Sequence, residues 1–327
     1  MKTAGSATYA LCILICLSVC MAGCGKKATI VKTSSGAENA LFTDDGRLFI
    51  TGLDNIFEVT KDDAGQYAIH PLYTGNREFA GLAQYGDYLY VLCGETDASG
   101  TVTPYLLSAR IDLITTNATW NYLMGVFHET ALNDLLATDP EAAPIALPNG
   151  MDNDAKGYLY FADSYNGRIM RLKINPDKPK EVSELTQWWK RDGTYFTNGV
   201  SIKGSSLYLS GGMEVHKIEI LSDGTAGEDR VLHTRISFLD DLTTYAGGVI
   251  VADFISGTIF YVTDAGKVTY ETYPTFAGPS SVHLAQAPLF EPGGLIVTEQ
   301  GLMGQIPALG NQVSLFTPTL DLIKEGY

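Results

Sequence analysis

The sequence predicts an all-β fold: a six-bladed β-propeller with four-stranded blades. Residues 147–174 alternate apolar runs with polar turns at 152–157 and 165–167, which is typical of short strands in series. The same pattern returns at residues 197–220 and 239–262. Repeats of one small β unit call for stacked or closed units, because a single unit cannot bury its own apolar faces.

Six blade openings can be placed in register along the chain. They begin at Glu38, Ala80, Asn149, Asn198, Asp240 and Ser280. Their spacings are 42, 69, 49, 42 and 40 residues, which fits blades of about 40 to 50 residues. The longest spacing contains an insertion between blades two and three, residues 112–146, in which 130–136 have the capping residue and apolar spacing of a short helix. The insertion is either a lid over one face or decoration.

Composition limits the function classes. The chain has 327 residues, 34 of them Gly, and 18% are charged, as in a soluble globular protein rich in turns. The formal net charge of −15 argues against a nucleic-acid partner, since phosphate binding needs a basic surface.

The amino terminus has the features of a bacterial lipoprotein leader. A charged start at Lys2, an apolar run over 9–19 and small residues before Cys24 are typical of a signal peptide. Residues 21–24 resemble the lipobox, in which the cysteine is lipidated and becomes the mature terminus. The alternative is an uncleaved anchor, for which the apolar run is short.

We therefore expect three segments. Residues 1–23 form the signal peptide, 24–36 a lipidated, flexible tether, and 37–327 a single propeller domain. This organisation implies a protein of the cell envelope that faces outward from the cytoplasm and contacts the membrane through its lipid only. The propeller keeps only Cys93, so its fold does not depend on disulfides.

The candidate site follows from the openings. The first strand of each propeller blade lines the central channel, so Glu38, Asn149, Asn198 and Asp240 are expected to converge. Two carboxylates and two amides suit calcium, or another divalent metal, which could polarise a carbonyl oxygen and activate water. Each residue taken alone is also a common turn former. Ala80 and Ser280 at the same place show that the repeat itself does not require a polar residue.

At these residues the chain resembles the six-bladed propellers of the gluconolactonase and regucalcin group, with paraoxonase and strictosidine synthase as relatives. That group carries a Glu in blade one, Asn in blades three and four and Asp in blade five, and these hold a divalent metal. The matching motifs here are SGAENALFTDDGRLFIT, LPNG, FTNG and FLDD. The motifs of blades one and five look closer to those of paraoxonase, whereas strictosidine synthases lack the full set of four polar residues. Relatives differ by one position in blade five, so either Asp240 or Asp241 faces inward.

Other motifs are weaker. The stretch from His128 begins like the zinc motif HExxH, but Leu132 stands in place of the second histidine. Asp152 to Gly157 begins like an EF-hand loop yet lacks its final glutamate, which favours a turn between strands. His128 and His283 are candidate proton carriers.

Together these features predict a calcium-dependent hydrolase of lactones or related esters. Glu38, Asn149, Asn198 and Asp240 would hold the metal, Asp240 or Asp241 would act as general base, and Asn149 could also serve the substrate. The alternative is a non-catalytic envelope propeller that binds a ligand or protein and uses the metal structurally. Fold alone does not decide between them.

Overall fold

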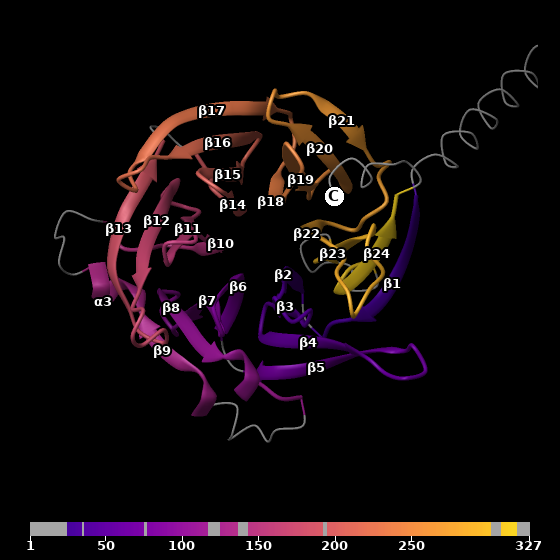
Figure 1. The fold of residues 1–327 in the computed structure, drawn as a ribbon, viewed down its shortest axis with the longest axis horizontal. Helices are drawn as coiled ribbons and strands as arrows, with labels where there is room; N and C mark the ends of the chain where they lie inside the picture. The colour runs from indigo at the N-terminus through magenta and orange to yellow at the C-terminus, as the bar shows by residue number, and fades with distance from the viewer. Residues whose placement is uncertain are drawn as a thin grey trace, which may run out of the picture.

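The protein is a six-bladed β-propeller. The computed structural model describes residues 25–34, 36–74, 77–116, 125–136, 143–191, 195–301 and 309–318. Their strands form six antiparallel sheets of four strands each, arranged in a ring (Figure 1). The predicted fold class and blade number are confirmed.

Each blade runs from an inner strand at the channel to an outer strand at the rim. Blade one consists of β2 (Ala37–Phe42), β3 (Leu48–Gly52), β4 (Asn55–Lys61) and β5 (Tyr67–Thr74), and blade two of β6 (Arg77–Tyr85), β7 (Tyr88–Thr96), β8 (Val102–Arg110) and β9 (His128–Ala131). Blade three consists of β10 (Pro148–Asn153), β11 (Tyr158–Asp163), β12 (Arg168–Ile174) and β13 (Val182–Lys190), and blade four of β14 (Val200–Lys203), β15 (Ser206–Gly211), β16 (Glu214–Ile220) and β17 (Ala226–Thr234). Blade five consists of β18 (Leu239–Tyr245), β19 (Gly248–Asp253), β20 (Thr258–Thr263) and β21 (Val268–Glu271), and blade six of β22 (Pro279–Leu284), β23 (Leu295–Glu299), β24 (Gln312–Thr317) and β1 (Lys26–Lys32).

The amino-terminal strand closes the ring. β1 pairs with β24 as the outer strand of blade six, so blade six is built from both ends of the described chain. In Figure 1 the indigo β1 lies beside the yellow β24. The prediction of a flexible tether over residues 24–36 is therefore wrong for Lys26–Lys32, and the propeller begins before residue 37.

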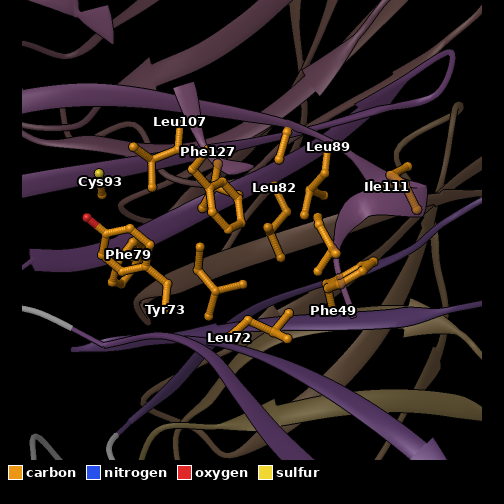
Figure 2. Close-up of a cluster of buried hydrophobic side chains, with 14 residues drawn as sticks. Phe49, Leu72, Tyr73, Phe79, Leu82, Leu89, Cys93, Leu107, Ile111 and Phe127 are labelled. Carbon is orange, nitrogen blue, oxygen red and sulfur yellow. The ribbon is translucent and has the colours of Figure 1, made fainter. Parts of the chain in front are cut away.

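The apolar core is divided among the blade interfaces. Six clusters of buried side chains lie between neighbouring blades. Figure 2 shows the one between blades one and two, where Phe49 and Leu72 face Phe79 and Leu89. Successive residues of β7 serve two interfaces: Leu89, Val91 and Cys93 face blade one, whereas Tyr90 and Leu92 face blade three. Both faces of a blade are thus buried, which explains the continuous apolar runs in the sequence.

The insertion between blades two and three is smaller than expected. Its segment 128–131 is β9, the outer strand of blade two, so this part is not an insertion. The predicted helix is present as α3 (Leu132–Leu136), and η1 (Ile111–Leu113) follows β8. Leu132 and Leu136 of α3 pack into the cluster between blades two and three, at the rim of the ring (Figure 1). Residues 117–124 and 137–142 lie outside the described residues, so the lid prediction stays untested for them.

The predicted signal peptide and the lipidation site Cys24 also lie outside the described residues. Within the part of the chain that the structure describes, no helix has the length and apolar character needed to span a bilayer.

Candidate active site

The site residues occupy bulges at the start of the inner strands. In β2, β10 and β18 the pairing register slips, so that two consecutive residues oppose a single residue of the neighbouring strand. The first residue of each such pair is Glu38, Asn149 or Asp240. A bulge bends the strand and re-aims its side chains, and here it turns these residues out of the ladder. Asn198 stands just ahead of β14, at the same end of its blade.

The four predicted metal ligands come together around one cavity. Glu38, Asn149, Asn198 and Asp240 line a space of about 260 Å³, the site cavity. Its other lining residues are Phe196, Phe238, Phe254, Ile255 and Gln300. Residues from blades one, three, four, five and six thus meet at the end of the channel where the inner strands begin. The four side chains that the blade register placed together thus line one cavity in the structure.

The position after three of the site residues packs against the next blade. A Cβ on Gly150 would lie 2.6 Å from the carbonyl oxygen of Asn198, and one on Gly199 would lie 2.4 Å from Asp241 Oδ1. Blade five carries Asp241 at this position, and its Oδ2 accepts a 2.7 Å hydrogen bond from Ser281 Oγ of blade six. Asp241 therefore ties two blades together and does not line the site cavity.

Asp241 lines a second space instead, the rear cavity of about 200 Å³. This cavity lies toward the carboxyl ends of the inner strands and also contains Asp152, Ser201 and His283. Asp152 accepts hydrogen bonds from the backbone N–H of Ile202 (2.7 Å) and Asn153 (2.8 Å). Burial raises the pKa of Asp152 to about 6.

Neither candidate histidine lines the site cavity. His283 Nε2 lies 4.0 Å from Asp241 Oδ2 in the rear cavity, and burial lowers its pKa to about 4. His128 is exposed on the outer strand β9 of blade two. The EF-hand look-alike is the turn that the sequence favoured, because Asp154 Oδ1 accepts from the backbone N–H of Lys156 (2.9 Å) and Tyr158 (3.0 Å).

Burial and mutual repulsion dominate the electrostatics of the site cavity. Burial, followed by the charges of Asp241 and Glu78, raises the pKa of Glu38 to about 8. The pKa of Asp240 is raised well above its usual value by burial and then by Glu38 and Asp241, while a hydrogen bond from the Asn198 side chain opposes this shift. Glu38 Oε2 also accepts a 2.8 Å hydrogen bond from Gln300 Nε2. Two carboxylates are therefore held together with few donors to stabilise their charges.

This donor set fits a hard divalent cation. Asn149 Oδ1 is buried and has no hydrogen-bond partner among the residues that the structure describes, which is costly unless a ligand takes it up. A dication would offset the two carboxylate charges, and all four side chains offer oxygen, the ligand atom that calcium prefers. Within the described residues, no group of three or more His, Cys, Asp or Glu side chains is placed to hold a metal. A metal site here would therefore combine two carboxylates, Glu38 and Asp240, with two amide oxygens, those of Asn149 and Asn198.

Sequence reasoning missed the apolar wall of the cavity. Phe196 and Phe238 each stand two residues before a site residue, in FTN and FLD, and their rings lie 5.3 Å apart. Phe254 and Ile255 follow β19 in the next turn. The repeated phenylalanine at one distance ahead of Asn198 and Asp240 was a signal that could have identified two of these residues.

Comparisons with known proteins bear on the fold. No protein-family model matches the sequence, and no curated protein is similar enough in sequence to count as a relative. Among solved structures, a protein assigned as a gluconolactonase has 14% identity and a TM-score of 0.62, with 90% of this chain and 92% of that chain covered. The calcium-binding protein regucalcin from Agrobacterium tumefaciens has 11% identity and a TM-score of 0.62, covering 90% and 94%. The likeness establishes the fold.

A third neighbour is a different kind of protein. An auxiliary nutrient-binding protein from Bacteroides ovatus has 11% identity and a TM-score of 0.59, with 90% of this chain and 74% of that chain covered. Propellers of this shape therefore carry more than one function, and function must be argued from the site.

Proposed function

We propose that this protein is a calcium-dependent hydrolase of lactones or related esters. The observation that carries the proposal is the site cavity itself, in which Glu38, Asn198 and Asp240 surround the buried Asn149 Oδ1, an oxygen without a hydrogen-bond partner among the described residues. The likeness to gluconolactonase-type and regucalcin propellers is compatible with this activity but, at 14% and 11% identity, supports only the fold.

Each side chain has a role that its surroundings support. Glu38, Asn149, Asn198 and Asp240 would hold the cation, and calcium would supply a Lewis acid for the substrate carbonyl. Asp240 would take a proton from the attacking water as the water oxygen bonds to the carbonyl carbon, and would return it to the alcohol oxygen when the acyl–oxygen bond breaks. Asn198, which donates to Asp240, would keep its carboxylate oriented. The apolar wall would exclude other water.

The direct test is turnover of a substrate panel with and without a chelator. Aliphatic lactones, aldonolactones, aryl esters and phosphotriesters should be incubated with the calcium-loaded protein. We expect hydrolysis of at least one lactone or ester, its loss in excess chelator and its recovery when calcium is returned. Absence of turnover across the panel would refute the enzyme proposal.

The second candidate is a non-catalytic propeller that binds a ligand in the same cavity. The observation in its favour is that a nutrient-binding protein shares the fold. In that case a calcium-loaded protein would retain a lactone intact, and mass spectrometry would recover it without ring opening.

We also propose that the protein is a lipoprotein of the cell envelope, attached through Cys24. The motivation is the run of small residues ahead of Cys24 after a short apolar segment. Mass spectrometry of the mature protein should find an acylated amino-terminal Cys24, and Cys24→Ser should stop processing. An intact leader in the membrane fraction of the wild type would contradict this.

A further inference from the structure

The site cavity has two unlike sides. One side holds the four oxygen donors together with Gln300, whose amide already donates to Glu38. The other side consists of Phe196, Phe238, Phe254 and Ile255. Within the described residues, the cavity is lined by no hydroxyl group and by no charged group besides Glu38 and Asp240.

The apolar side is a continuous row of aromatic rings across blades three to five. Tyr165 and Phe196 lie 5.8 Å apart between ring centres, Phe196 and Phe238 5.3 Å, and Phe238 and Phe254 6.4 Å. Ile255, at the end of this row, is 64% exposed although it lines the cavity. Large apolar side chains left open beside a polar constellation are typical of a ligand site, where apolar walls bind the body of the ligand and a few polar groups orient it.

The row continues into a side groove of about 440 Å³ that shares Phe254 and Ile255 with the site cavity. The groove lies between blades five and six and is also lined by Pro274, Phe276 and Leu309. A substituent that extends past Phe254 and Ile255 therefore reaches this groove, which is open to water and whose lining also includes Lys27 and Thr275. This gives room for a chain longer than the first cavity holds.

We propose that the site takes lactones or esters that carry an alkyl or aryl substituent, in preference to polyhydroxylated sugar lactones. This inference rests on the proposed hydrolase function and adds its substrate class. The ring hydroxyls of an aldonolactone would meet phenylalanine faces that accept no ordinary hydrogen bond, and a buried hydroxyl without a partner is costly. An alkyl or aryl group gains from the same faces by leaving water.

The test is a homologous series of γ-lactones from γ-butyrolactone to γ-decalactone, compared with glucono-δ-lactone on the calcium-loaded protein. We expect kcat/KM to rise about three- to fourfold per methylene group that reaches the wall, and to be at least tenfold lower for gluconolactone than for γ-octalactone. A flat series, or gluconolactone as the best substrate, would overturn the substrate class while leaving the hydrolase intact.

Variants locate the effect. Ile255→Ser changes an exposed side chain and should fold. Ile255→Ser and Phe238→Ala, as separate variants, should each reduce kcat/KM for γ-decalactone by roughly tenfold, and Phe238→Leu should restore most of this loss. Met213→Ala is the matched control, because Met213 is an exposed apolar residue of a neighbouring loop that lines neither space. An unchanged series in Ile255→Ser and Phe238→Ala would contradict the proposal.

A binding measurement distinguishes failure of the substrate-class proposal from failure of the hydrolase proposal. If no lactone is hydrolysed, the hydrolase proposal fails, and calorimetry with the lactam analogue of γ-decalactone then decides the ligand class. Binding that weakens in Ile255→Ser but not in Met213→Ala supports an apolar ligand site in a non-catalytic propeller. Absence of binding overturns the inference as well.

Discussion

Asp240 and Asp241 are adjacent in the chain, yet they belong to different cavities. The bulge in β18 places both opposite Ala252, so the usual alternation of side chains along a strand does not apply to them. Asp240 lines the site cavity, whereas Asp241 accepts from Ser281 of the next blade. Two adjacent carboxylates therefore have different surroundings: Asp240 faces the site cavity, and Asp241 contacts the next blade.

Under the proposed metal site, Glu38 should make calcium binding depend on pH. Because its pKa is raised from 4.5 to about 8, the folded calcium-free protein retains a proton that the unfolded chain has lost. This contribution to the free energy of unfolding therefore falls as pH rises from about 4.5 to 8. The carboxylate form of Glu38 is the one that would bind calcium, so calcium should raise Tm more at pH 8 than at pH 6. At pH 8 and a hundredfold excess of calcium over Kd, we expect a rise of about 5 °C. Thermal unfolding checks this, and an equal rise at both pH values, or the same pH dependence in Glu38→Gln, would count against it.

Asn149 should matter for rate and not for the stability of the calcium-free protein. Within the described part of the chain its Oδ1 has no partner, so Asn149→Ala removes a buried polar atom that makes no hydrogen bond there. We expect little or no loss of Tm without calcium, and a fall in kcat/KM of about ten- to a thousandfold that exceeds the loss of calcium affinity. Asn153→Ala, at the other end of β10, is the control. A larger loss of apo stability than of rate would contradict a ligand-facing role.

At the scale of elements, β1 holds the ring closed. Lys27 Nζ donates to the fully buried Glu299 carboxylate (2.7 Å) and to the backbone carbonyl of Thr275 (3.0 Å). Glu299 also accepts from the backbone N–H of Ala277 (2.7 Å) and from Ser314 Oγ (2.5 Å). Blade six is thus joined to the amino-terminal strand by a charged contact in addition to the β1–β24 ladder.

Lys27→Ala should destabilise the propeller by about 2–4 kcal/mol, because it leaves the buried Glu299 carboxylate without its cation. The matched control is Lys26→Ala on the same strand, whose side chain is exposed and should change the free energy of unfolding by no more than about 0.5 kcal/mol. Chemical denaturation of both variants gives the comparison. Equal effects would mean that the Lys27–Glu299 pair adds nothing to closure.

The strand β1 also shows where sequence reasoning stopped. In Lys26–Lys32 only Val31 is buried, because an outer strand at the rim has little core to face. Without alternating apolar residues, the segment read as a tether, although lysines on an edge strand are a common protection against unwanted pairing. Inner and middle strands bury both faces and were recognisable. The bulges were not, since they follow from pairing with a neighbouring strand and leave no local pattern.

At the scale of the whole molecule, the site depends on ring closure. The four donor residues come from blades one, three, four and five, and Gln300 and Glu38 join blades six and one across the closure. Blade register alone was enough to predict that the donors converge, because equivalent positions in a closed ring face one axis. The apolar wall lies in loops, where only Phe196 and Phe238 repeat at one distance before a site residue, so Phe254 and Ile255 required the structure.

The central claim is that these four residues hold one divalent cation, and calcium titration calorimetry of Asp240→Asn and Asp241→Asn tests it most directly. Both changes remove one carboxylate at adjacent positions, and an asparagine at 241 can still accept from Ser281. We expect one calcium bound per chain in the wild type and in Asp241→Asn, and no measurable binding in Asp240→Asn. Unchanged calcium affinity in Asp240→Asn, or equal loss in both variants, would contradict it.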